Sequence, residues 1–589
     1  MQKPTAACTM KHSPRPNQTL CVTVQSVHSS SILCSHPQSS TLYTVPRPKK
    51  GHILPQTSLV IQVGKQRGRN LYEGRIIPIP KPQTVFAVEQ GLIRDLSLPT
   101  SPPPHISHAE PLDPSDLRDL THLPFVTIDG DRAKDFDDAI AIVNEGDQWR
   151  LFVAVADVTH FVPFAKKQHP LSTDSWARLY GNTFYFPTFA LPMLPKELAT
   201  SICSLLPNQD RQTLVMEACI SKRGTIRSTA FSLSRIRSQA RLTYEGVKAC
   251  FLDGYAKAKE HLLSLPQGEA IYSMLSEGFL MREELFSRRR KAGSLSLHLN
   301  DIDYHIDSKG HLKDIKETSP HAGHSLIEEC MLVANEAAAT LLLANNCPFL
   351  SRIHPAPSPE KLQALATILA LHAPALLPKN QRLFPADLAK LIERASQTPL
   401  ASTIHRLCLR SLPKACYSPS SEGHFGLAKT HYCHATSPIR RYADVLIHRA
   451  IKRVIGVGSD PLFDHKRLAH IADHLNRQEY TAQLLERELA RRLGVLFMQK
   501  AIGKDFALIV TGVHPTGLFV RLQNHPIEGR IPTCFFPANC AADCRMQCLR
   551  TRSGSLILGL GAQIWGELVS LDPLNFLLTF YPRSPWNPR

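Results

Sequence analysis

The chain has 589 residues and a formal net charge of +18, and this excess of Lys and Arg favours a polyanionic partner, usually nucleic acid. No apolar run approaches the roughly 20 residues of a membrane-spanning helix, which argues against membrane association. Fifteen cysteines without paired spacing argue against a disulfide framework and predict reduced thiols in a cytoplasmic protein.

Residues 1–96 are poor in acidic side chains. The first acidic residue is Glu73, and the stretch before it is rich in Ser, Thr, Pro and basic residues. This composition is typical of an organelle transit segment, but the β-like runs at 20–24 and 58–63 argue against a disposable peptide. We predict a small, degenerate OB or cold-shock-like barrel that contacts an RNA backbone, with organelle targeting as the minor alternative.

Residues 97–115 contain six prolines and are predicted to be an interdomain linker. A domain at 116–502 follows, and its first part alternates apolar β-like runs at 125–128, 139–143 and 149–158. Helical patterns come later. We expect a buried helix at 326–345, short surface helices between 372 and 400, and a long polar helix at 465–500.

Four carboxylates crowd into ten positions behind the first of these strands, namely Asp129, Asp135, Asp137 and Asp138. Ionised carboxylates that converge repel one another, so they must hold a cation, pair with basic side chains or take up protons. Oxygen ligands favour Mg²⁺ or Mn²⁺. Convergence requires a turn after the strand, which Gly130 permits. The alternative is a solvated acidic turn.

A second informative segment lies at 423–449. Ser437 suits an N-cap and Pro438 the first helical position, which predicts a helix that runs to about Val454. Arg440 would then lie in the first turn and prepare an anion site at the helix N-terminus. The alternative is a surface ion pair between Arg440 and Asp444.

Residues 503–582 change to short strands with glycine turns, expected at 506–513, 517–522, 556–560, 563–569 and 576–581. The runs 517–520 and 528–531 resemble an S1-type RNA-binding barrel, in which Phe519 either stacks on RNA or fills the core. An insertion carries four cysteines that could bind Zn²⁺, although their spacing favours free thiols: Cys534, Cys540, Cys544 and Cys548. Residues 583–589 form a tail.

Several motifs match one family in order and spacing. They are the acidic cluster, the strand motif at 155–160, and the segments at 191–195, 241–244, 327–329 and 424–449. Over residues 116–582 the chain resembles the RNB exoribonucleases, the family of ribonuclease II and ribonuclease R. The resemblance implies an α+β protein whose central mixed α/β RNB catalytic domain is flanked by small OB-type barrels, the first cold-shock-like and the last S1-type.

The resemblance also implies catalytic roles for residues of this chain. Asp129, Asp135, Asp137 and Asp138 match four aspartates that hold Mg²⁺ or Mn²⁺ at the scissile phosphate. One ion would activate a water and a second would steady the leaving oxygen. Arg440 matches an arginine that neutralises the developing charge.

Other residues are expected to bind RNA. Tyr185 matches an aromatic that stacks on the 3′-terminal base, with a core aromatic as the alternative. Glu486 matches a helix glutamate that contacts the terminal nucleotide, with a solvated surface residue as the alternative. Arg441 and Phe519 complete this set, whereas Asp131 is interpreted as a turn residue.

The implied activity is processive, sequence-independent 3′ to 5′ hydrolysis of single-stranded RNA to nucleoside 5′-monophosphates by a two-metal-ion mechanism. We expect a monomer, with unknown helper proteins in RNA decay. Two alternatives stay open. One is a catalytically weak RNA-binding protein on the same fold, and the other is a metal-dependent endonuclease.

Overall fold

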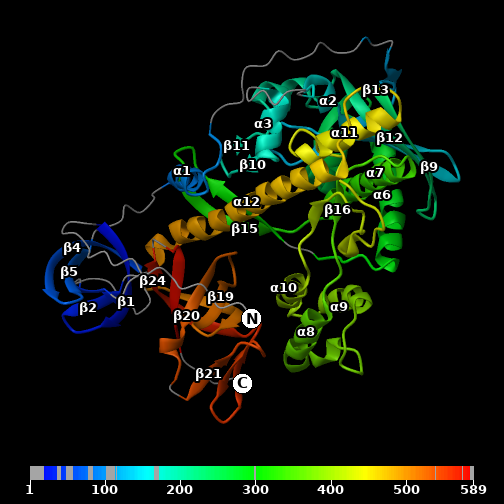
Figure 1. Ribbon diagram of the computed structural model, residues 1–589. Helices are drawn as coiled ribbons and strands as arrows, with labels where there is room; N and C mark the ends of the chain where they lie inside the picture. Colours follow the sequence, from blue (N-terminus) through cyan, green and yellow to red (C-terminus); the bar gives the residue numbers. More distant parts are fainter. Residues whose placement is uncertain are drawn as a thin grey trace. The chain divides into compact units, whose positions relative to one another are not determined.

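The computed structural model describes residues 19–35, 41–47, 58–76, 84–100, 113, 116–164, 172–297, 300–537, 539–572 and 575–583 (Figure 1). Most of the predicted linker at 97–115 and of the tail at 583–589 lies outside these residues. Contacts divide the chain into two compact units. The first comprises Met1–Leu92, Ile302–Glu317 and Glu486–Arg589, and the second comprises Ile93–Asp301 and Thr318–Leu485.

The first unit contains a closed N-terminal barrel of five strands in the order β1-β2-β3-β5-β4. Side chains alternate between buried and less buried along β2 and β3, as a strand with one face in a core requires. The predicted small barrel is confirmed, and it is closed rather than degenerate. Its strands are β1 Thr19–Val27, β2 Ser31–Ser35, β3 Leu42–Pro46, β4 Ser58–Gly68 and β5 Leu71–Ile76, and α1 Val85–Asp95 follows.

A second closed barrel lies near the C-terminus, in the order β18-β19-β20-β25-β24. The hairpin β14–β15 adds Ile315 to its core, beside Leu508 and Phe580. A Cβ at Gly529 would lie 2.5 Å from the Phe580 ring, so β20 can pass over that ring only with glycine there. The strands are β14 Asp301–Ile306, β15 Leu312–Thr318, β18 Asp505–His514, β19 Gly517–Leu522, β20 Glu528–Pro532, β24 Gln563–Asp572 and β25 Leu577–Pro582.

The prediction that residues 556–560 form a barrel strand is wrong. Leu556–Gly559 is β23 of a separate three-stranded sheet with β21 Cys540–Asp543 and β22 Cys548–Thr551, and β20 takes its place in the barrel. Cys540 pairs with Thr551 and Cys548 with Asp543, so these two thiols lie at opposite ends of one hairpin. The described residues hold no group of three or more His, Cys, Asp or Glu side chains spaced to bind a metal ion.

The second unit is built on a six-stranded sheet in the order β12-β9-β8-β7-β13-β6. The helices α6 and α7 pack on it, and the predicted buried helix at 326–345 is confirmed as part of α7. A Cβ at Gly278 would lie 2.9 Å from Ile142, so this glycine lets α6 approach the sheet closely. The bounds are β6 Arg118–Asp119, β7 Phe125–Asp129, β8 Asp138–Asn144, β9 Gln148–Ala156, β12 Asp210–Ser221, β13 Ile226–Thr243, α6 Gly268–Lys291 and α7 Ala322–Ala344.

Further elements complete the second unit around this sheet. The predicted long polar helix is confirmed as α12, which continues into the first unit. The bounds are α2 Val158–Phe161, α3 Thr173–Tyr180, β10 Phe184–Tyr185, β11 Ala190–Leu191, α4 Tyr244–Phe251, α5 Ala256–Leu263, β16 Ser351–Ile353, α8 Pro359–His372, α9 Leu388–Ala395, α10 Ala401–Ser411, β17 Cys416–Ser418, α11 Tyr442–Val454 and α12 His465–Met498.

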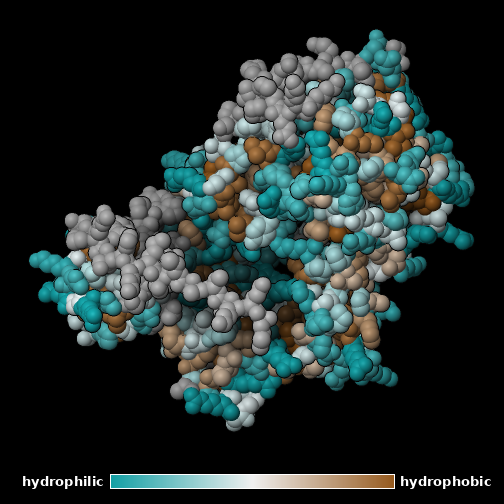
Figure 2. Space-filling model, in the orientation of Figure 1, coloured by the Kyte–Doolittle hydropathy of each residue, from teal (hydrophilic) through white to brown (hydrophobic). Residues whose placement is uncertain are grey.

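Hydrophilic residues cover most of the face shown in Figure 2, and apolar patches interrupt them. Within the described part of the chain, no helix has the length and apolar character needed to cross a membrane. Among the exposed large apolar side chains are three aromatics of the C-terminal barrel: Phe519, Trp565 and Tyr581.

Candidate active site

The four predicted carboxylates lie at one edge of the central sheet. Asp129 is the last residue of β7 and Asp138 is the first residue of β8. These strands are antiparallel, with Val126 opposite Ile140, so the end of one adjoins the start of the other. Asp135 and Asp137 lie on the loop between them. The expected turn after the strand is confirmed.

Side chains from other strands and loops hold this loop in place. The Arg241 guanidinium on β13 donates to the carbonyl oxygens of Gly130 at 2.7 Å and Asp131 at 2.9 Å. The Ser204 hydroxyl accepts from the Phe136 backbone N–H at 3.0 Å. Asp131 itself is exposed in a turn, as expected. The loop conformation therefore depends on residues that lie far from it in the sequence.

Asp137 joins the acidic loop to the second motif. Its side chain is 4% exposed. Oδ1 accepts from the backbone N–H of Ile439 at 2.7 Å, and Oδ2 lies 3.6 Å from Nε of Arg440. The structure thus brings Arg440 to the predicted carboxylates, and its guanidinium remains half-exposed beside them.

The predicted start of the helix after Ser437 is wrong. Residues 438–440 form a turn, and α11 begins at Tyr442 with Arg441 as its N-cap. The reason is a competing pairing, because Tyr442 N–H donates to Gly181 O at 2.9 Å and Thr183 N–H donates to Arg440 O at 3.0 Å. Arg440 therefore lies in the turn before the helix rather than in its first turn.

The alternative pair between Arg440 and Asp444 is also absent. Asp444 is fully buried, accepts from the Ser437 backbone N–H at 2.7 Å, and pairs with Arg441 at 2.7 Å. The guanidinium of Arg441, which was expected to bind RNA, is thus directed at a buried carboxylate. This contact indicates a structural role for Arg441.

Tyr185 lies on the short strand β10 and is 47% exposed, whereas the neighbouring Phe184 is 1% exposed. The alternative of a core aromatic is therefore wrong for Tyr185. Its hydroxyl donates to Oδ2 of Asp135 at 2.9 Å. An exposed ring thus stands beside the carboxylates, tethered to one of them.

The carboxyl groups of this site share an unusual electrostatic environment. Burial raises the pKa of Asp129 to about 6 and of Asp138 to about 7, and in each case a neighbouring carboxylate adds to the rise. Burial also raises the pKa of Asp137 well above its ordinary value, although Arg440 and the Ile439 N–H oppose this. Arg440 lowers the pKa of all three, so it acts as a cation shared by the cluster.

Two predicted RNA-binding residues belong to the first unit. Glu486 is exposed on α12, and its charge adds to the burial that raises the pKa of Tyr304 on β14. Phe519 is 45% exposed on β19, so the alternative that it fills the barrel core is wrong. Trp565 and Tyr581 are exposed aromatics of the same barrel that the sequence reasoning missed.

Comparison with known proteins places this site in a family. The family model of the RNB domain matches residues 117–456, which contain the acidic loop, Tyr185 and Arg440. The chain belongs to the RNB domain family.

The similarity to RNB relatives covers most of the chain. Ribonuclease R of Aquifex aeolicus is 33% identical over 476 residues, which cover 78% of this chain and 65% of that protein. Mycoplasma genitalium RNase R, solved in complex with ribose methylated single-stranded RNA, has a TM-score of 0.76 at 23% identity and covers 96% of this chain and 89% of its own. Yeast Ssd1, a pseudonuclease, has a TM-score of 0.62 at 19% identity, with 91% and 68% covered.

The matched region spans between about half and two thirds of the length of the curated relatives, 51% of one and 65% of another. The solved structures support the fold. One of them is described as an RNase and another as a pseudonuclease, so proteins with and without nuclease function share this fold. The flanking barrels and the central mixed α/β domain expected from the sequence are confirmed.

RNB ribonucleases are metal-dependent hydrolases, and the donor atoms at this site fit a divalent ion. Asp129, Asp135, Asp137 and Asp138 offer only carboxylate oxygens, which suit Mg²⁺ or Mn²⁺. No three side chains of the described cluster stand close enough to bind an ion without moving. Asp135 raises the pKa of Asp129, and Asp129 raises that of Asp138, so each ionised neighbour disfavours ionisation of the next carboxyl group. A bound cation would favour the ionised forms.

Sequence reasoning missed the supporting residues of the RNB site. Arg241 and Tyr244 were noted only as part of a family motif. Arg241 ties down the acidic loop, and the pKa of the Tyr244 hydroxyl is raised by burial and then by Asp138 and Asp129. Tyr244 therefore lies near the carboxylates. The signal that could have found both is their position, because Arg241 lies near the end of β13, which pairs with β7 up to Asp129, and Tyr244 directly follows that strand.

Proposed function

We propose that this chain is an exoribonuclease that hydrolyses single-stranded RNA processively from the 3′ end to nucleoside 5′-monophosphates. One observation carries the proposal. A single sheet edge gathers four carboxylates, an arginine beside the most buried of them, and an exposed tyrosine tethered to another. These are the groups that a phosphodiesterase needs for a metal, for transition-state charge and for a terminal base.

The four aspartates would hold the divalent ions, Mg²⁺ by preference. A pair of such ions, when bound, supplies an activated water and stabilises the leaving oxygen in an in-line displacement. The chain's own contribution is to fix the ligands. The Ile439 N–H orients Asp137, the Tyr185 hydroxyl orients Asp135, and Arg241 holds the loop that carries both.

Arg440 supports the chemical step. Its half-exposed guanidinium stands at the mouth of the carboxylate cluster, where it can donate to a phosphate oxygen as negative charge builds up. Ser437 Oγ accepts from the same guanidinium at 3.2 Å and limits its motion. The planar ring of Tyr185 can stack on a base of any identity, which accounts for hydrolysis without sequence preference.

Product analysis tests this function. In the presence of Mg²⁺, an RNA labelled at its 3′ end should release its label at once as a mononucleotide. The same RNA labelled at its 5′ end should be converted to a short end product without labelled products of intermediate length. A ladder of internal fragments would establish an endonuclease instead. Equal rates on DNA of the same sequence would contradict the assignment to RNA.

A second candidate is an RNA-binding protein on the same fold. The likeness to yeast Ssd1 favours it, because a pseudonuclease shares this architecture. The presence of all four carboxylates and Arg440 favours catalysis. If RNA binds but no nucleotide is released in Mg²⁺ or Mn²⁺, the second candidate is correct.

A monomer in the cytoplasm is part of the proposal. The cysteines of the described residues are free thiols, which accords with a reducing compartment. Sedimentation of the purified protein and fractionation of cells test these two statements. Any helper protein would be found by co-purification.

A further inference from the structure

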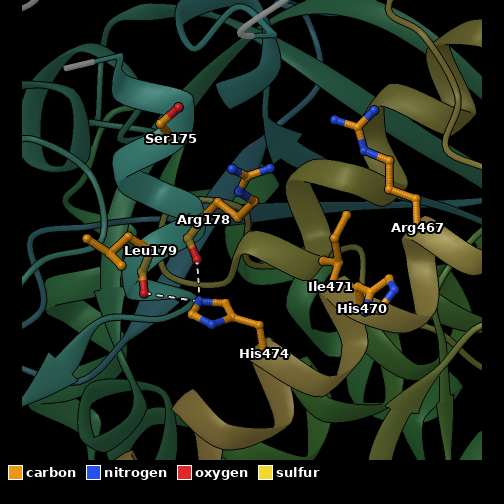
Figure 3. Close-up of a pocket in the computed structure, with 7 residues that line it drawn as sticks. All are labelled: Ser175, Arg178, Leu179, Arg467, His470, Ile471 and His474. Atoms are coloured by element: carbon orange, nitrogen blue, oxygen red, sulfur yellow. Dashed lines mark hydrogen bonds between the residues drawn. The ribbon is translucent and has the colours of Figure 1, made fainter. Parts of the chain in front are cut away.

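A cavity of about 530 Å³ lies between α3 and the N-terminal half of α12 (Figure 3). Both walls belong to the second unit. The cavity is distinct from the carboxylate edge, since within the described residues none of its lining side chains forms a hydrogen bond or ion pair with the four aspartates. It is lined by Ser175, Arg178, Leu179, Arg467, His470, Ile471 and His474.

The lining is basic and contains no acidic side chain. Arg178 and Arg467 extend from opposite walls toward the space between the helices (Figure 3). Neither guanidinium has an ion pair with any acidic side chain in the described segments, although the Arg467 group lies over the Phe463 ring at 4.5 Å. Other arginines of this unit are neutralised, for example Arg449 by Asp174 at 2.8 Å.

The rest of the lining defines the shape of the site. His474 is committed to the wall, because its Nε2 donates to the carbonyl oxygens of Arg178 at 2.8 Å and Leu179 at 3.2 Å. Leu179 is 51% exposed and Ile471 is 7% exposed, so they provide an apolar surface below the charged groups. His470 adds an exposed imidazole.

We propose that this cavity, called the groove below, binds one nucleotide of an RNA strand at a site separate from the carboxylates. Each of the two guanidinium groups that extend into this space can donate two parallel N–H bonds to a phosphate. The volume lies in the range of small-ligand sites and accommodates a nucleotide, and the apolar surface offers packing for a ribose or base. RNA is the occupant that the charge favours in a protein of net charge +18.

The covalent connection of the groove to the catalytic edge supports RNA as the ligand. The chain runs from Arg178 through Gly181 to Tyr185, so their Cα atoms are at most about 25 Å apart. A strand of about seven stacked nucleotides, at about 3.4 Å each, spans that distance. One RNA of moderate length can therefore occupy both places.

The test measures RNA binding in an Asp137→Asn background, so that the RNA stays intact. Arg178→Ala/Arg467→Ala is compared with Arg223→Ala/Arg410→Ala, which removes the same charge from exposed arginines elsewhere in the unit. We expect the groove variant to flatten the dependence of log Kd on log salt concentration by about 0.7 for a 16-nucleotide RNA, because one phosphate contact is lost.

Further outcomes separate the groove from folding effects and from the proposed function. Arg178→Lys/Arg467→Lys keeps the charge and should retain most of the salt dependence. His470→Glu, at an exposed position, should weaken binding of the long RNA without lowering the melting temperature. The proposal is overturned if the groove variant and its control show the same salt dependence of Kd for the 16-nucleotide RNA. It is also overturned if the groove variant loses affinity for polyglutamate, an acidic polymer without phosphate, but not for RNA. Because these measurements need no hydrolysis, an inactive wild-type protein would overturn the proposed function and leave the groove intact.

Discussion

The backbone N–H of Ile439 donates to Oδ1 of Asp137 at 2.7 Å, and this bond joins two motifs that are 302 residues apart in the sequence. It fixes the most buried carboxylate of the cluster and also the turn that carries Arg440. The acidic loop and the turn therefore form one structural unit of the site, and a change in either should disturb the other.

Asp137→Asn should lower turnover by more than about 10²-fold while leaving RNA affinity nearly unchanged. The amide oxygen can still accept from Ile439, so the loop keeps its shape, but a charged oxygen ligand is lost. Single-turnover hydrolysis and equilibrium binding measure the two effects. Asp131→Asn is the matched control, because Asp131 is exposed in the same loop and should tolerate the change. Near wild-type turnover of the Asp137 variant would refute its metal role.

Arg440→Ala should reduce turnover by about 10²- to 10³-fold with a much smaller effect on affinity, since its guanidinium is placed to act on charge that develops during the reaction. Arg440→Lys should recover part of the loss, because lysine retains the positive charge but lacks the planar guanidinium that can donate two parallel hydrogen bonds. Steady-state kinetics with a short RNA separates kcat from KM. A large rise in KM at unchanged kcat would show that Arg440 only binds substrate.

Arg441→Ala should act on stability instead. Removing this guanidinium leaves the fully buried Asp444 without its ion-pair partner, at a cost of about 3 kcal/mol or more in the free energy of unfolding. Urea denaturation measures this cost. If stability is unchanged and RNA affinity falls, the guanidinium binds RNA as first expected and its contact with Asp444 is dispensable.

The contribution of Asp129 and Asp138 to stability in EDTA should fall as the pH rises from about 4 to about 7. The pKa of Asp129 is raised to about 6 and that of Asp138 to about 7, whereas both would ionise near pH 4 in the unfolded chain. Between these values the folded protein binds more protons than the unfolded chain, so deprotonation favours unfolding. A divalent ion requires ionised ligands, so Mg²⁺ should raise the melting temperature more at about pH 8 than at about pH 5.

The matched control for this pH effect is Asp129→Asn/Asp138→Asn. Relative to the wild-type protein, it should remove the loss of stability that these two groups cause between about pH 4 and 7 in EDTA, and it should weaken the response to Mg²⁺. An equal Mg²⁺ increment at both pH values in the wild-type protein would mean that the ion binds elsewhere.

Gly181→Ala should lower both stability and turnover. Gly181 has φ +69°, and a Cβ there would lie 3.0 Å from Cβ of Gln478, which donates to Leu179 O at 3.0 Å. The same glycine accepts from Tyr442 N–H beside Arg440. Gly254→Ala is the control, because its φ of +67° carries the same left-handed strain of about 1 kcal/mol in open space. Equal losses in the two variants would mean that the contact with α12 has no part in placing Arg440.

Much of this site could be predicted because local rules decided it. Asp129 ends one apolar strand and Asp138 begins the next. Because a short turn joins the two strands, both residues lie at the same edge of the sheet, independently of the rest of the chain. The buried helix α7 was equally evident, since small and apolar residues cover it nearly all round.

The failures have a common physical cause. Ser437 and Pro438 form a good helix start locally, but the pairing of residues 440–442 with 181–183 overrides it. The pairing of Arg441 with Asp444 was not foreseen, because nothing nearby in the sequence reveals that Asp444 is fully buried; RNA binding by Arg441 stays a prediction. Residues 556–559 have a strand pattern, and the pattern alone does not say which sheet they join. In each case a partner distant in sequence determined the outcome.

The hairpin β14–β15 lies between α6 and α7 in the sequence, but its Ile315 packs in the core of the C-terminal barrel. During synthesis, Ile315 leaves the ribosome about 190 residues before Leu508, a buried residue of the first strand of that barrel. At about 5 to 20 residues per second, this interval lasts about 10 to 40 s. The nascent chain therefore exposes the apolar side of this hairpin until translation is almost complete.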